Sequence, residues 1–230
     1  MTKVLLCSEG KTDHGYDTYS DGEYTHTDGV IQVFLQKLAH EETLAFIVRT
    51  HSEVKGFAII PNPNKLAPKN LVFGRKLAAI AQKEACRCIA YHRDEDNKGF
   101  DHVYNQIRGY LSVADECGIR CLAIVPMHMT ESWLLSDANA FPSMPSKPAL
   151  PRKPEETWGK PESEFHPKRY LKRVLAQFHR YPSTDEFAEV AEKSNAEVLL
   201  KRCPVSFRRF YDDMNALFPL CKSAREEETD

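Results

Sequence analysis

Short apolar runs alternate, over the first two thirds of the chain, with segments whose apolar residues recur at helical spacing. A run that is apolar throughout predicts a strand buried on both faces, and a repeat every three or four residues predicts an amphipathic helix. Alternation of the two is typical of a parallel sheet covered by helices on both sides. The expected strands are 4–7, 44–48, 86–91 and 119–125, and the expected helices are 30–38, 71–85, 103–114 and 131–135.

Proline changes the pattern after residue 141. Seven of the 14 prolines lie between 142 and 167, at first at every third position, which favours an extended linker or loop. We therefore expect an α/β domain over 1–140, a proline-rich linker or loop over 141–167, and a helical C-terminal extension over 168–222 packed on the domain. The helices expected at the C-terminal end are 167–178, 184–194 and 204–217.

Composition argues against several classes of protein. The 230 residues carry 31 basic and 33 acidic side chains, a formal net charge of −2, so a nucleic-acid surface would have to be local. No apolar run approaches the roughly 20 residues that cross a bilayer, and the first ten residues do not read as a signal peptide. Seven cysteines without a C-x-x-C pair argue against a zinc ribbon or a disulfide framework. We therefore expect a cytoplasmic protein with no membrane contact.

Acidic residues follow three of the four expected strands. Glu9 leaves the first strand, Asp94 and Asp96 follow the third, and Glu131 begins a short helix after the fourth. Ligands of parallel sheets bind at the carboxyl ends of the strands, so these carboxylates are placed to meet there. Clustered carboxylates need a cation to neutralise them, and Mg²⁺ prefers oxygen ligands of this kind.

Each acidic motif also has an ordinary structural interpretation. Glu9 could belong to a polar turn, the 94–96 loop could cap the following helix, and Glu131 could complement a helix dipole. His92 is interpreted as an orienting or capping imidazole rather than a ligand, and Asp101 is a further acidic candidate. The three motifs together are more specific than any one alone.

The combined pattern resembles the Toprim domain. The residues that carry the resemblance are S-E-G-K-T-D at 8–13, D-E-D at 94–96 and P-M-H-M-T-E-S-W-L-L at 126–135, and it covers about residues 1–137. Toprim proteins include topoisomerases, bacterial primases, ribonuclease maturases and the overcoming-lysogenisation-defect nucleases. The chain looks most similar to a small Toprim-like family of unknown function whose members often neighbour an ABC-type ATPase in phage-defence operons.

This resemblance implies a Rossmann-like, mainly parallel sheet and metal-dependent phosphodiester chemistry. Glu9 would be the general acid/base or a metal ligand, Asp94 and Asp96 would hold Mg²⁺, for which Mn²⁺ could substitute, and Glu131 would complete the site as a further metal ligand. The chain departs from a compact Toprim domain in a polar stretch at 14–27 and in an insertion at 52–69, whose role is open.

Basic residues near these motifs are candidates for contact with a nucleic-acid backbone. Between 145 and 180 there are nine lysines and arginines against four acidic residues, a local charge of +5. Spacing at i and i+4 gives the expected helix at 167–178 one positive face, although an ordinary solvated face would look the same. The segment 207–211, with three aromatics and two arginines, is better interpreted as core that docks the last helix. The candidate phosphate-binding residues are Lys11, Lys168, Arg169, Lys172 and Arg173.

The sequence therefore favours a Mg²⁺-dependent nuclease that cleaves DNA or RNA, in antiviral defence with a partner ATPase. Two alternatives remain open: a non-catalytic Toprim-like module that binds nucleic acid or the ATPase, and a metal-dependent phosphotransfer enzyme with a small substrate. Homo-oligomerisation, the number of metal ions and the type of nucleic acid are also left open.

Overall fold

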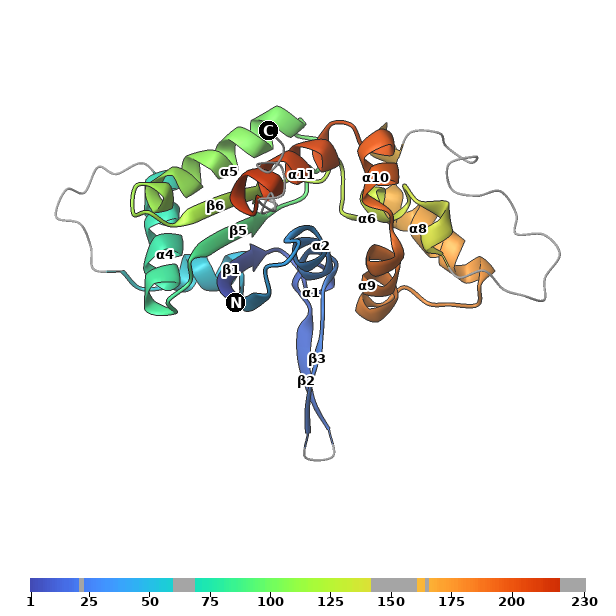
Figure 1. The fold of residues 1–230 in the computed structure, drawn as a ribbon, viewed down its shortest axis with the longest axis horizontal. Coiled ribbons are helices and arrows are strands. Elements are labelled where there is room, and N and C mark those ends of the chain that lie inside the picture. Colours follow the sequence, from blue (N-terminus) through green and yellow to red (C-terminus); the bar gives the residue numbers. More distant parts are fainter. Residues whose placement is uncertain (21–22, 60–68, 142–160, 164–165, 220–230) are drawn as a thin grey trace, which may run out of the picture.

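The computed structural model in Figure 1 describes residues 1–20, 23–59, 69–141, 161–163 and 166–219. Its centre is a four-stranded sheet in the order β4-β1-β5-β6, and every neighbouring pair of strands is parallel. This confirms the predicted α/β fold with a four-stranded parallel sheet. The strands are β1 (Thr2–Ser8), β4 (Leu44–Thr50), β5 (Cys88–His92) and β6 (Arg120–Ile124).

Both faces of the sheet are buried, because the apolar runs put side chains alternately on each side. On β1, Val4 and Leu6 belong to one hydrophobic cluster, whereas Leu5 and Cys7 belong to another. All four side chains are at most 1% exposed. The central strands therefore separate two cores, and each core needs its own layer of helices.

Two long helices supply the main cover of the face that carries Leu5 and Cys7. They are α4 (Lys69–Lys83) and α5 (Phe100–Asp115), and the short α3 (His51–Gly56) lies beside α4. Leu77 of α4 and Ile107 of α5 are fully buried in this cluster. The predicted helices at 71–85 and 103–114 are thus confirmed with small shifts of their ends.

The opposite face is covered by α2 (Val30–Leu38) together with the C-terminal helices. Phe34 of α2 contacts Trp133 and Phe207, which come from two other helices of this layer. The C-terminal helices therefore share one hydrophobic cluster with the sheet. The other helices on this side are α6 (Glu131–Leu134), α8 (Pro167–Gln177), α9 (Thr184–Lys193), α10 (Ala196–Arg202) and α11 (Ser206–Leu217), with short 3₁₀ turns at Ala138–Ala140 and Pro161–Ser163.

Trp133 fixes α11 to the end of the sheet. Its ring stacks on Phe210 at a centroid distance of 5.3 Å, and its indole Nε1 donates to Ser206 Oγ at 2.7 Å. The buried Glu162 carboxylate accepts from the Ser206 backbone N–H at 2.6 Å at the start of α11. Phe207 and Phe210 are at most 1% exposed, which agrees with the interpretation of 207–211 as docking core.

The connections between strands create a switch point in the sheet. The chain leaves β1 through α2 on one face, and it returns to β5 through α4 on the other. Because β1 and β5 are neighbours, a crevice is expected outside their carboxyl ends, where ligands of open α/β sheets bind. Glu9 and Asp94 follow these two strands.

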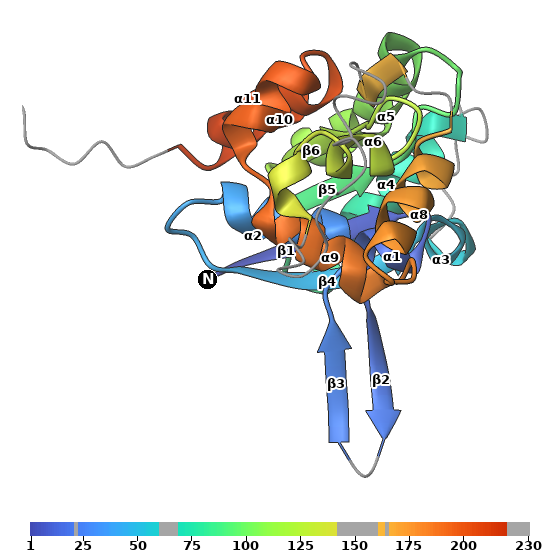
Figure 2. The same cartoon turned by 90° about the vertical axis from the view of Figure 1, so that its right-hand side faces the viewer.

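A two-stranded hairpin projects from the body of the protein (Figures 1 and 2). It consists of β2 (Tyr16–Ser20) and β3 (Glu23–Thr27), paired antiparallel, within the stretch 14–27 that was expected only to be polar. Nearly all its side chains are exposed, so no apolar alternation marks either strand. Helices α3 and α10 were also not predicted, since both are short, with six and seven residues.

Two predicted segments lie largely outside the described residues. These are the proline-rich segment 141–167, of which 142–160 and 164–165 are not described, and the insertion 52–69, of which 60–68 are not described. In the described part of the insertion, residues 52–56 belong to α3. None of the helices within the described ranges is both long enough and apolar enough to cross a membrane.

Two glycines hold the loop after β1 against the start of α2. A Cβ on Gly29 would lie 2.2 Å from the backbone nitrogen of Gly15 and 2.4 Å from the carbonyl of Asp13. Gly15 itself has a φ of +75°, which favours glycine. The close backbone contact thus positions Asp13, which lies in the site described below.

We predict that Gly29→Ala lowers the free energy of unfolding by about 3 kcal/mol, since backbone atoms must move to admit the methyl group. Gly109→Ala in α5 is the matched control: its Cβ would have no neighbour within 4 Å, and the change should raise the free energy of unfolding by about 0.5–1 kcal/mol. Denaturant unfolding measures both. Equal effects of the two substitutions would contradict the close contact.

Candidate active site

The residues after β1 carry two acidic side chains to the carboxyl edge of the sheet. Glu9 directly follows the strand, and Asp13 lies in the short α1 (Lys11–His14). The Glu9 side chain is 45% exposed, and its Oε1 lies 3.5 Å from Arg93 Nε. The Asp13 side chain is only 14% exposed and accepts a hydrogen bond from Thr130 Oγ1 at 3.1 Å.

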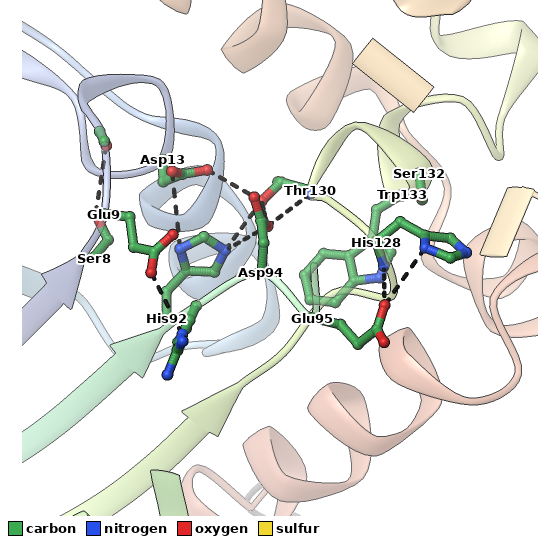
Figure 3. Close-up of polar contacts among 12 residues, drawn as sticks. Ser8, Glu9, Asp13, His92, Asp94, Glu95, His128, Thr130, Ser132 and Trp133 are labelled. Carbon is green, nitrogen blue, oxygen red and sulfur yellow. Dashed lines mark hydrogen bonds and ion pairs between the residues drawn. The ribbon is translucent and has the colours of Figure 1, made fainter. Parts of the chain in front are cut away.

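His92, the last residue of β5, lies at the centre of this edge (Figure 3). Its side chain is fully buried, with Nε2 at 3.0 Å from Thr130 Oγ1 and 3.5 Å from Asp94 Oδ1. Its Nδ1 lies 3.9 Å from Asp13 Oδ2 and makes no hydrogen bond to the described residues. The imidazole thus lies between two carboxylates from different strand ends.

These carboxylates determine the charge of the imidazole. Burial alone would lower the pKa of His92, but the negative charge of Asp13, the contact with Asp94 and the charge of Glu9 together raise it to about 9. His92 is therefore an imidazolium at neutral pH. It supplies one positive charge inside a group of acids that would otherwise repel one another.

Asp94 links the end of β5 to the start of α6. Its Oδ1 accepts from the Thr130 backbone N–H at 3.1 Å and lies 3.3 Å from the Thr130 hydroxyl. That hydroxyl has one proton, so it donates to Asp94 or to Asp13 at any moment. Through Thr130, the segments after β1, β5 and β6 are joined in one polar network, as Figure 3 shows.

Glu131 is the most buried of the predicted acidic residues, at 6% exposure. Burial is the main reason that its pKa rises to about 7, and the charges of Asp94 and Asp13 add to the effect. Its own backbone N–H and Lys168 act in the opposite direction. Burial and the Asp94 charge also raise the pKa of Glu9, and burial raises that of Asp13. The charge of Asp94 thus raises the pKa values of the other three acids of this edge, which are Glu9, Asp13 and Glu131.

Asp96 does not pair with Asp94 as the spacing predicts. The chain turns out of the strand conformation here, with φ of +53° at Asp96, and its carboxylate lies 3.4 Å from Lys98 Nζ. Glu95 is buried instead, at 4% exposure, and accepts backbone N–H groups of Asn97 and His128 at 3.1 Å each. Glu95 thus shapes the loop, while Asp96 reaches the site only as a charge that helps to raise the pKa of Glu9.

The acidic side chains are neighbours without forming a ready coordination shell. Within the described ranges, no group of three or more His, Cys, Asp or Glu side chains is arranged to hold a metal ion. The donor chemistry nevertheless suits a hard cation, because Glu9, Asp13, Asp94 and Glu131 all offer carboxylate oxygens.

Basic residues of α8 border the acids. Lys168 is close enough to lower the pKa values of both Asp13 and Glu131. A surface pocket of about 390 Å³ beside it is lined by Arg169 and Lys172 as well. Arg173 lies instead over the Tyr170 ring, at 5.7 Å from its centroid.

Lys11 takes a different place from the basic residues of α8. Its Nζ lies 5.8 Å from the Tyr16 ring centroid, and the residue lines a pocket at the base of the hairpin. The structure therefore brings Lys168, but not Lys11 or Arg173, next to the acidic cluster.

Comparison with known proteins gives one match. Residues 111–215 are similar to a family described as a domain of unknown function (DUF4276). This segment contains Glu131 and the basic helix α8, but it excludes β1, β5, Glu9 and Asp94. No curated protein and no solved structure matches the chain.

Two residues of the network, Asp13 and Thr130, were not assigned a role from the sequence, and His92 was interpreted as an orienting or capping imidazole. Asp13 could have been identified from the sequence because it is the last residue of the motif S-E-G-K-T-D. The roles of His92 and Thr130 depend on contacts between strand ends that are 38 residues apart in the chain, and no local pattern encodes these.

The raised pKa of Glu131 predicts a pH-dependent stability. Between the ordinary glutamate pKa of 4.5 and about 7, the folded protein keeps a proton that the unfolded chain loses, so stability falls as pH rises through this window. The stability of wild type relative to Glu131→Gln should drop by about 3 kcal/mol between pH 4.5 and pH 7.5. Metal-free denaturant unfolding of both proteins measures the difference.

Glu116→Gln, at an exposed carboxyl that follows α5, is the matched control for loss of one acid. A Glu131→Gln difference that stays constant between the two pH values would show that Glu131 ionises at its ordinary pKa in the folded protein.

Proposed function

We propose that the acidic edge of the sheet catalyses metal-dependent hydrolysis of phosphodiester bonds in nucleic acid. The observation that carries the proposal is that Thr130 joins Asp13 to Asp94, while Lys168, on the helix packed against α6, lines a surface pocket together with Met129, the residue before Thr130. A phosphodiester is an anion, and it needs a cationic surface beside the acids that would hold a metal ion. The proximity of this lysine to the acids supports the proposal.

Glu9, Asp94 and Glu131 would hold Mg²⁺ or Mn²⁺ through their carboxylates, with Asp13 as a further acid that the sequence did not single out. Bound there, the ion would polarise the phosphate and lower the pKa of a water molecule. His92 and Thr130 are positioning residues, because they hold Asp13 and Asp94 toward each other without reaching solvent.

The Toprim resemblance supports the same chemistry and adds a context. Proteins of the resembling family occur beside ABC-type ATPases in phage defence, so we propose a cytoplasmic nuclease in antiviral defence with such a partner. The match to DUF4276 neither favours nor opposes this context, since that family has no described function.

A second candidate is a non-catalytic module that binds nucleic acid or a partner ATPase. The imidazolium of His92 favours it, because this charge already neutralises part of the acidic cluster without any metal. The absence of a ready coordination group within the described ranges points the same way. The two candidates share a fold and a basic surface but differ in the need for a divalent ion.

The test of catalysis is cleavage of plasmid and of single-stranded DNA and RNA with Mg²⁺, Mn²⁺ or EDTA. We predict cleavage that requires the ion and that Asp94→Asn and Glu9→Gln each lower by about 100-fold or more, since each removes a carboxylate oxygen from the site. Asp96→Asn should have a much smaller effect because Asp96 faces Lys98. Glu116→Gln, in the turn after α5, is the matched control.

Cleavage that survives Asp94→Asn would come from a contaminant or another site and would contradict the proposal. Ion-independent binding of nucleic acid without any cleavage, by wild type alone and with an ATPase partner, would favour the non-catalytic module.

The basic helix generates a separate prediction. Lys168→Glu combined with Lys172→Glu should weaken nucleic-acid binding and reduce the slope of log K against log salt by about 2, because two phosphate contacts are lost. Lys83→Glu, an exposed lysine at the end of α4, controls for a change of net charge. Binding titrations at several salt concentrations give the slope. An unchanged slope in the double variant would exclude α8 from the binding surface.

A further inference from the structure

A cavity of about 480 Å³ is lined by Glu9 together with residues of α3, α4 and α5 that take no part in the acidic cluster. Its volume is within the range of pockets that bind small molecules. It lies between the face of α4 that carries Phe73 and the ends of β1 and β5, so Glu9 and Arg93 line it. The mechanism proposed above uses Glu9 but leaves the rest of the cavity without a role.

One wall of the cavity is apolar and aromatic. Val72 is 37% exposed, and the neighbouring Phe73 ring lies 5.1 Å from the Tyr110 ring. His51 lies 4.7 Å from Phe73 on the other side, and its Nδ1 is hydrogen-bonded to the Tyr91 hydroxyl at 2.6 Å. Phe73 is buried, at 8% exposure, so Val72 and the partly exposed Tyr110 provide the accessible part of the wall, against which a flat ring can pack.

The rest of the cavity lining is charged, with three cationic side chains and one acidic side chain. Lys55, Lys76 and Arg93 line the cavity together with Glu9. Lys76 donates to the backbone carbonyl of Lys55, which joins α4 to α3. Burial lowers the pKa of His51, and the positive charges of Lys55 and Arg93 lower it further. The cavity therefore favours an anionic ligand.

Arg93 is prepared for such a ligand. Its side chain is 20% exposed, and Nη1 donates to Gln106 Oε1 at 2.8 Å, which fixes one end of the guanidinium. Its buried Nε makes no hydrogen bond to the described residues and lies 3.5 Å from Glu9 Oε1. Arg93 therefore connects the cavity directly to the acidic edge.

We propose that this cavity binds one nucleoside phosphate, with the base against the wall of Val72, Phe73 and Tyr110 and the phosphate near Lys55, Lys76 and Arg93. The choice of a nucleotide rests on the proposed function, since a nucleotide seated beside Glu9 would adjoin the site of cleavage. A base stacked on an aromatic surface contributes about 1–3 kcal/mol without selecting a sequence. The nucleotide can be a free monophosphate or one unit of a strand.

The test is calorimetric binding in EDTA, with adenosine 5′-monophosphate, adenosine and inorganic phosphate as separate probes. We expect adenosine 5′-monophosphate to bind about tenfold or more tightly than adenosine or inorganic phosphate alone, because only the monophosphate contacts both the apolar wall and the cationic residues. Lys76→Glu should weaken its binding by about tenfold or more, and Tyr110→Leu by about fivefold or more. Lys83→Glu, seven residues further along α4 and outside the cavity, should change it less than about twofold.

Equal affinity for inorganic phosphate and the monophosphate would overturn the proposal, and so would binding that is insensitive to Lys76→Glu and Tyr110→Leu. Thermal melting of each variant shows whether it folds. Competition by a short single-stranded oligonucleotide identifies the source: displacement of the monophosphate indicates a strand unit, and its absence a free nucleotide.

The test of nucleotide binding can fail or succeed independently of the test of nuclease activity. Because binding is measured without metal, nucleotide binding by a protein that does not cleave would overturn the nuclease alone. Ion-dependent cleavage without nucleotide binding in the cavity would overturn this inference alone.

Discussion

The fully buried imidazole of His92 lies between Asp13 and Asp94, and the geometry of the whole edge depends on this contact. Asp13 follows β1, His92 is the last residue of β5 and Asp94 lies just after it, and Thr130, which binds both carboxylates, follows β6. Burying several carboxylates together is unfavourable unless a positive charge accompanies them. The imidazolium provides that charge, so the ends of three parallel strands can meet in one polar network below the protein surface.

The same charge balance separates the two candidate functions. An internal imidazolium is enough to hold the acids in a binding module. A catalytic site must also admit a divalent ion, which adds positive charge next to His92. Glu9 is half exposed beside Arg93, whereas Glu131 is buried and lies under the influence of the Lys168 charge, and under our proposal these two acids and Asp94 would bind that ion.

The sequence predicts the sheet well, because buried parallel strands are continuous apolar runs and the helices between them carry apolar stripes. It also predicts that Glu9, Asp94 and Glu131 reach one edge, since the carboxyl ends of parallel strands converge. Asp96 does not join the acidic cluster, contrary to the prediction from its spacing to Asp94, because a positive φ at Asp96 turns the chain away from the strand direction. The hairpin gave no signal because both of its faces are polar, and the network through His92 depends on contacts between distant segments.

Anomalous diffraction from a crystal soaked in Mn²⁺ would locate a divalent ion at the acidic edge. We predict a peak between the carboxylates of Glu9, Asp94 and Glu131, with His92 remaining buried behind it and Asp96 outside the coordination shell. A cluster that stays free of manganese while the crystal takes up the ion elsewhere would contradict the claim that these acids form a metal-dependent site.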